Sequence, residues 1–152
     1  MNVGAARIPE IKNPAVVRFP AEVDLSNGDL ILEEALRLLR EGVPGLVMDL
    51  GGCTFCDSSG PNAIFRAKVR ADAAGVPLAV VVPETGVVRR ICDIAGVTRR
   101  IPVAPDLESA LAEIAVAARR PAPAKQASAV NSAPGRPAPA GHHRPDGGRR
   151  AS

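Results

Sequence analysis

The chain has 152 residues, the size of one ordinary domain, and its only aromatic residues are three phenylalanines, so its core must be aliphatic. Residues 1–118 carry 12 Lys and Arg against 15 Asp and Glu, whereas residues 119–152 carry 7 against 1. The net negative charge of residues 1–118 and the small number of aromatic rings argue against nucleic-acid binding by the folded domain. No stretch approaches the roughly 18 apolar residues that span a bilayer, and no signal-peptide pattern is present. We therefore expect a cytoplasmic protein with no membrane partner, whose three cysteines are reduced.

Composition divides the chain into three segments. Residues 1–14 are poorly defined, because Pro9 and Pro14 interrupt any strand. Residues 15–118 hold the periodic elements of a single domain. Residues 119–152 are rich in Pro, Ala and Gly, and they cannot bury enough apolar surface to offset the entropy lost on ordering. We expect this last segment to be a disordered basic tail.

The domain begins with a strand and a helix. Residues 15–19 form the first clear apolar strand, and Glu22-Val23-Asp24 leads into a cluster of turn residues. Over residues 29–41 apolar side chains recur at three- and four-residue steps, which predicts an amphipathic helix that ends at Gly42.

A strand, a turn and a helix follow over residues 46–74. The strand leads through the brief apolar piece Thr54-Phe55-Cys56 to Asp57-Ser58-Ser59-Gly60, which are residue types that cap a helix N-terminus. The helix dipole leaves this end with partial positive charge, so a phosphate on an exposed serine is tolerated there. The same four residues are also an ordinary N-cap, and the motif alone does not decide between the two readings.

The second half continues the alternation. Residues 78–82 form a continuous apolar strand, and a helix with a single apolar stripe follows, ended by Gly96. That stripe comprises Val87, Val88, Ile91, Ile94 and Ala95. Residues 101–103 are a short edge strand, and Asp106 caps a last helix. The buried row expected for this helix is Leu107, Leu111, Ile114 and Ala118. This alternation predicts an α/β fold.

The order and spacing of several blocks resemble the STAS domain, and more narrowly the bacterial anti-sigma factor antagonists. The blocks lie within residues 15–118 and are Glu22–Asp24, Val47–Leu50, Phe55–Gly60, Val88–Ile91, Ile94–Val97 and Leu107–Leu111. The resemblance implies a mixed sheet of four or five strands with helices mostly on one side. STAS domains usually open with a strand that forms a hairpin with the next one, and residues 1–14 depart from that pattern.

In that family the serine directly after the aspartate accepts phosphate, which maps onto Ser58. The resemblance implies an anti-sigma factor antagonist that binds an anti-sigma factor of the serine-kinase type and releases it once Ser58 is phosphorylated. A serine phosphatase is expected to reverse the step, so that the protein regulates sigma-factor-dependent transcription. Asp57 is expected to shape the helix entry and Ser59 to be the capping neighbour. Gly60 is expected to keep the approach open for a kinase loop, and Asp24 to contact the partner.

Pro61 stands where the family usually has an aliphatic residue. Proline disfavours helical dihedrals at the residue before it, here Gly60. This allows a helix that begins at Pro61, with Ser58 and Ser59 on the preceding loop.

Catalytic and metal-binding readings find less support. Residues 15–118 contain no histidine, Ser58 lacks a G-x-S-x-G context, and no phosphate-binding loop for a nucleotide is present. Cys53 and Cys56 form a C-x-x-C, but no second pair completes a zinc tetrahedron, and we interpret both as small apolar core residues. We expect a protein without catalytic activity, metal or cofactor. The alternative to the switch is a scaffold STAS module that docks through its basic tail.

Overall fold

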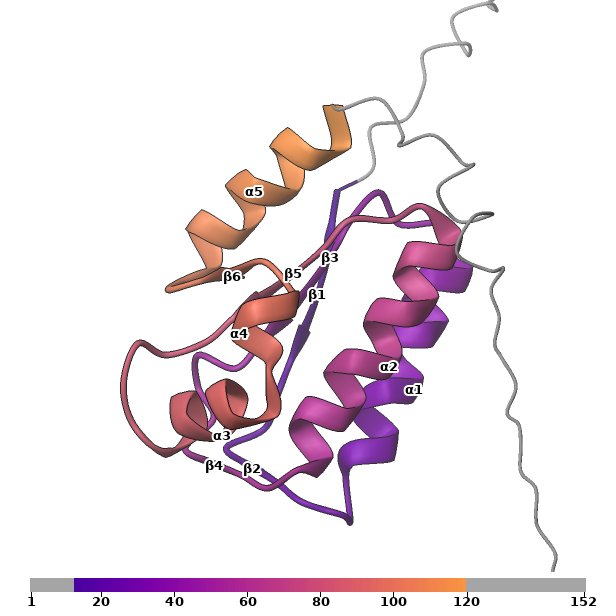
Figure 1. Cartoon of the computed structure of the whole chain (residues 1–152). Helices are drawn as coiled ribbons and strands as arrows, with labels where there is room; N and C mark the ends of the chain where they lie inside the picture. The colour runs from indigo at the N-terminus through magenta and orange to yellow at the C-terminus, as the bar shows by residue number, and fades with distance from the viewer. Residues whose placement is uncertain (1–12, 120–152) are drawn as a thin grey trace, which may run out of the picture. The chain divides into compact units, whose positions relative to one another are not determined.

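The structure is a computed structural model that describes residues 13–119, so the expectations for residues 1–12 and 120–152 lie outside it (Figure 1). One sheet has four strands in the order β1-β3-β5-β6. They are β1 Ala15–Arg18, β3 Leu46–Asp49, β5 Leu78–Val81 and β6 Val103–Ala104. A second, two-stranded sheet pairs β2 Glu22–Val23 with β4 Phe55–Cys56.

Five helices are seen in the described part: α1 Gly28–Arg40, α2 Ser59–Ala74, α3 Val87–Ala95, α4 Val97–Arg100 and α5 Leu107–Arg119. Because helices return the chain between successive strands of the main sheet, every strand pairing within residues 13–119 is parallel. The single α/β domain is confirmed. The strand pairings of this part are parallel, with none of the antiparallel pairing that the expected mixed sheet requires.

Side chains alternate between the two faces of the main sheet, because successive residues of a strand point to opposite sides. Leu46 and Met48 of β3 join the larger core cluster with α1 and α2, whereas Val47 joins a smaller cluster with Ile114 of α5. Figure 1 shows α1 and α2 on one face and α5 on the other. The expectation that helices lie mostly on one side is confirmed, since residues of α3 and α4 also join the larger cluster.

The orientation of α3 differs from the predicted stripe. Val88 and Cys92, four residues apart, are buried, whereas Val87 and Ile94, seven apart, are 57% and 72% exposed. A helix advances about 100° per residue, so these two pairs lie on different faces, and the core takes only one of them.

The last helix is also turned from its predicted row. Ala110 and Ile114 are its buried residues, Ala118 is exposed, and the two predicted leucines are half-buried. Its predicted cap is confirmed, because the Asp106 Oδ1 accepts a hydrogen bond of 2.7 Å from the Ser109 backbone N–H.

Candidate functional site

The candidate phosphosite lies at the N-terminus of α2. Ser58 is the N-cap, its carbonyl oxygen accepts the first helical hydrogen bond from the Asn62 N–H, and the helix begins at Ser59. The interpretation that the helix begins at Pro61 is therefore wrong. Pro61 is the third helical residue, where its missing N–H costs nothing because the first N–H groups of a helix have no intrahelical acceptor. The preceding Gly60 has no Cβ to clash with the proline ring.

The two adjacent serines have opposite environments. Ser58 is exposed, and its side chain makes no capping hydrogen bond. The Ser59 hydroxyl is buried and has no hydrogen-bond partner within residues 13–119. A Cβ added to Gly28 would lie 3.0 Å from the Ser59 Cβ, so the first turns of α1 and α2 are in contact here.

The cap is provided by the residue before the N-cap. The Asp57 Oδ1 accepts a hydrogen bond of 2.7 Å from the Ser59 backbone N–H. The expected shaping of the helix entry by Asp57 thus has a definite contact, while Ser59 supplies the capped N–H rather than a capping side chain. A carboxylate suits this position, because the helix dipole is positive there.

Asp24 lies on the neighbouring loop. Val23 of β2 pairs with Cys56 of β4, so Asp24 and Asp57 both follow the ends of paired parallel strands. Hydrogen bonds from the Ser26 hydroxyl and the Ser26 backbone N–H to the Asp24 Oδ1 hold the pKa of this carboxyl below its usual value. Asp24 is therefore ionised at neutral pH.

Gly60 has a different role from the expected open approach for a kinase loop. It is buried, and a Cβ at this position would overlap with the Cys56 Sγ and lie 3.8 Å from the Val23 Cγ1. The missing side chain lets the first turn of α2 pack closely on β2 and β4. Gly60 is thus needed for the close packing of the core beneath the site.

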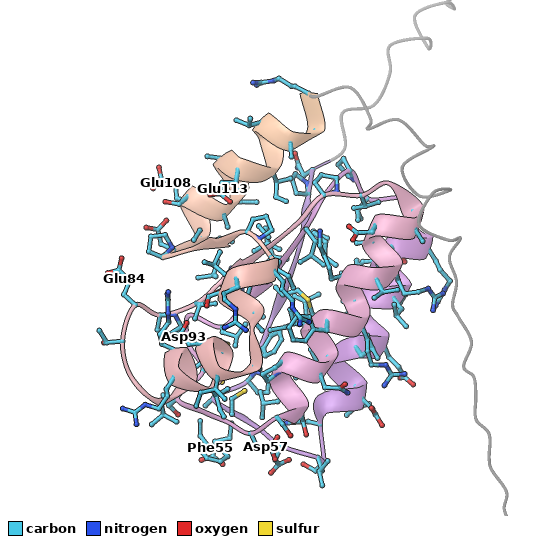
Figure 2. All side chains as sticks on the ribbon, viewed as in Figure 1. Phe55, Asp57, Glu84, Asp93, Glu108 and Glu113 are labelled. Atoms are coloured by element: carbon cyan, nitrogen blue, oxygen red, sulfur yellow. The ribbon has the colours of Figure 1, made fainter. Side chains whose placement is uncertain are left out.

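Two exposed apolar residues beside the site were missed by the sequence analysis. Leu25 is 87% exposed and directly follows Asp24. Phe55 is 48% exposed and lies shortly before Asp57. Figure 2 shows Phe55 and Asp57 at the same end of the domain. A large apolar residue inside a cluster of turn residues was the available signal for Leu25. For Phe55 it was strand alternation, which turns Phe55 outward once Cys56 points inward.

A small hollow of about 80 Å³ lies between the first turns of α1 and α2. Its lining residues are Leu25, Gly28, Asp29, Leu32, Ser59, Asn62 and Ala63. Pockets for small organic ligands are usually several hundred Å³ in volume. This hollow is smaller than such a pocket.

The three cysteines are buried and free. Burial raises the pKa of Cys56 to about 12 and that of Cys92 to about 11, and it also raises the pKa of Cys53. Cysteines that remain thiols at neutral pH are weak nucleophiles and weak metal ligands. No group of three or more His, Cys, Asp or Glu side chains within residues 13–119 has metal-site geometry.

Replacing Cys53 and Cys56 together by Ala is expected to lower the free energy of unfolding by about 1–3 kcal/mol through lost packing. Urea denaturation measures this change, and elemental analysis of the wild-type protein is the companion experiment. Stoichiometric zinc in the wild type would contradict the interpretation of these cysteines as core residues.

Comparison with known proteins identifies the fold family. The STAS domain family model matches residues 5–110, and the chain belongs to this family. Comparison with curated proteins gives no match. Among helices within residues 13–119, none is long and apolar enough to cross a membrane.

Two similar solved structures are anti-sigma factor antagonists by description. One is a Thermotoga maritima protein assigned to that class, with 19% identity, a TM-score of 0.57, and coverage of 66% of this chain and 87% of the other. The second is the anti-sigma factor antagonist SpoIIAA in its unphosphorylated form, with 14% identity, a TM-score of 0.50, and coverage of 66% and 88%. At these identities the similarity is one of fold.

Proposed function

We propose that this protein is an anti-sigma factor antagonist whose binding is switched by phosphorylation of Ser58. Unphosphorylated, it binds an anti-sigma factor of the serine-kinase type in the cytoplasm and so frees a sigma factor. Phosphorylated, it releases the anti-sigma factor, and a serine phosphatase restores the binding form. The observation that carries the proposal is the exposed Ser58 hydroxyl at the N-cap of α2 in a STAS domain.

The environments of the two serines support Ser58 as the acceptor. A kinase must reach the hydroxyl oxygen, and the Ser59 oxygen is buried while Ser58 is exposed. The N-terminus of α2 tolerates the added negative charge, because its dipole is positive there. Asp57 is already engaged with the Ser59 N–H, so it holds the helix entry in place and leaves the Ser58 side chain outside the cap.

The surroundings of Ser58 support a protein partner. Leu25 and Phe55 expose apolar area beside the charged side chains of Asp24 and Asp57, a combination typical of protein interfaces. We assign Asp24 to partner contact, since its carboxylate is ionised and exposed on the adjacent loop. The protein acts in this proposal by binding, and it is the substrate of the kinase rather than an enzyme.

A phosphorylation assay tests the proposal against the scaffold alternative. Purified wild type, Ser58→Ala and Ser59→Ala are incubated with radiolabelled ATP and the serine-kinase anti-sigma factor of the same organism. Wild type and Ser59→Ala are expected to take up label, and Ser58→Ala is expected to take up none. Equal labelling of all three proteins would place the acceptor elsewhere, and no labelling of any would favour the scaffold function.

A further inference from the structure

Two arginine side chains converge at the junction of α3 and α4. Gly96 joins these helices with a φ of +93°, a conformation that glycine adopts most readily. A Cβ added to Gly96 would lie 3.2 Å from the Arg99 Nη2 and 3.8 Å from the Arg100 Nε. Both guanidinium groups therefore lie beside the same point of the backbone, which has no side chain to separate them.

Both arginine side chains are exposed, and the contacts that orient them bring no carboxylate to either guanidinium group. The Arg100 guanidinium lies 5.5 Å from the centroid of the Phe65 ring of α2. The Arg99 Nη1 donates a long hydrogen bond of 3.4 Å to the Asp93 backbone carbonyl oxygen. A ring face and a carbonyl orient a guanidinium group but carry no full negative charge.

Two other cations, one on α2 and one on α3, are compensated by carboxylates. Lys68 pairs with Asp72 at 2.9 Å, and Arg89 pairs with Asp93 at 3.1 Å. The Asp93 carboxylate also accepts a hydrogen bond from the Thr98 hydroxyl at 2.7 Å. Within residues 13–119 neither Arg99 nor Arg100 has an ion pair.

We propose that Arg99 and Arg100 form a binding site for a phosphoryl group. Two converging guanidinium groups repel each other until an anion lies between them. A phosphoryl group carries about −1.5 to −2 charges at neutral pH and has three acceptor oxygens. These oxygens can accept hydrogen bonds from the N–H groups of two planar guanidinium groups. The group comes either from free phosphate or from a phosphorylated serine of a protein segment.

This site is separate from Ser58. Phe65, which holds Arg100, lies six residues beyond the start of α2, or about 9 Å along the helix axis. The inference thus goes beyond the proposed switch and does not depend on phosphorylation of this chain.

The test is a titration of the full-length protein, with the arginine side-chain N–H resonances observed by NMR. Inorganic phosphate replaces chloride at constant ionic strength. We expect saturable shifts of the Arg99 and Arg100 Nε–H resonances, with no comparable shift for Arg66. Arg66 is a matched control, because it is exposed on α2 and has no ion pair within the described part of the chain.

Lysine variants test the role of each guanidinium group. Arg99→Lys and Arg100→Lys keep the charge but lose the planar donors, so each is expected to weaken phosphate binding about 10-fold, whereas Arg66→Lys leaves it unchanged. Circular dichroism checks that the variants fold. The proposal would be overturned by chemical-shift changes that rise linearly with phosphate concentration and are equal at all arginines. Unchanged phosphate affinity in both Arg99→Lys and Arg100→Lys would also overturn it.

A second titration with a phosphoserine peptide identifies the source. Tighter binding of the peptide than of inorganic phosphate assigns the site to a phosphorylated protein segment. Binding of inorganic phosphate that is equal or tighter assigns it to free phosphate.

Discussion

Ser58→Ala is expected to bind the anti-sigma partner constitutively, whereas Ser58→Glu is expected to bind it at least about 10-fold more weakly, with both variants folded. The Ser58 side chain lies outside the cap and near exposed Leu25 and Phe55, so a charge placed there must lose water when a partner covers these apolar side chains. It also adds to the negative charge of Asp24 and Asp57, and so repels any acidic surface of the partner.

Pulldown of the partner with each variant measures the effect. Ala73→Glu is the matched control, because it adds the same charge at an exposed position near the other end of α2. It should recover as much partner as wild type. Equal recovery by Ser58→Ala and Ser58→Glu would contradict the switch and favour the scaffold function.

Gly60→Ala is expected to lower the free energy of unfolding by about 1–3 kcal/mol. The added methyl would overlap with the Cys56 Sγ, which is buried beneath the first turn of α2 and has little room to move. Gly52→Ala is the matched control, since a Cβ there meets nothing within 4 Å. Urea denaturation of the two variants measures the difference, and equal midpoints would show that the Gly60 contact is not tight.

Combining Gly60→Ala with Cys56→Ala tests the mechanism of that loss. If the methyl and the sulfur compete for one space, the double variant is expected to be more stable than the sum of the two single effects predicts. Additive losses would show that Gly60→Ala acts through another contact.

The sequence predicted the elements better than their orientation. Apolar periodicity located α1 and β5 to within about one residue, because burial requires a repeat that matches the period of a helix or strand. It could not orient α3, in which Val87 and Val88 are equally apolar while packing against β4 decides which one is buried.

The details of the site depended on three-dimensional contacts. Nothing in Asp57-Ser58-Ser59-Gly60 says that one hydroxyl is exposed and the other buried, because this follows from the contact between Ser59 and Gly28 of α1. Likewise, the close approach of Gly60 to Cys56 depends on how the chain turns from β4 into α2. A role for Asp57 at the start of the helix could be predicted from the sequence, since carboxylates are favoured at helix N-termini.

The two-stranded sheet of β2 and β4 ties the candidate partner surface together. The Thr54 and Phe55 N–H groups both donate to the Ala21 carbonyl oxygen, at 2.7 and 3.1 Å, and the Asp57 N–H donates to the Val23 carbonyl oxygen at 3.1 Å. The loops that carry Asp24 and Ser58 are thereby joined through backbone hydrogen bonds. Such a preorganised surface has less conformational entropy to lose on association, so more of the contact energy is retained as affinity.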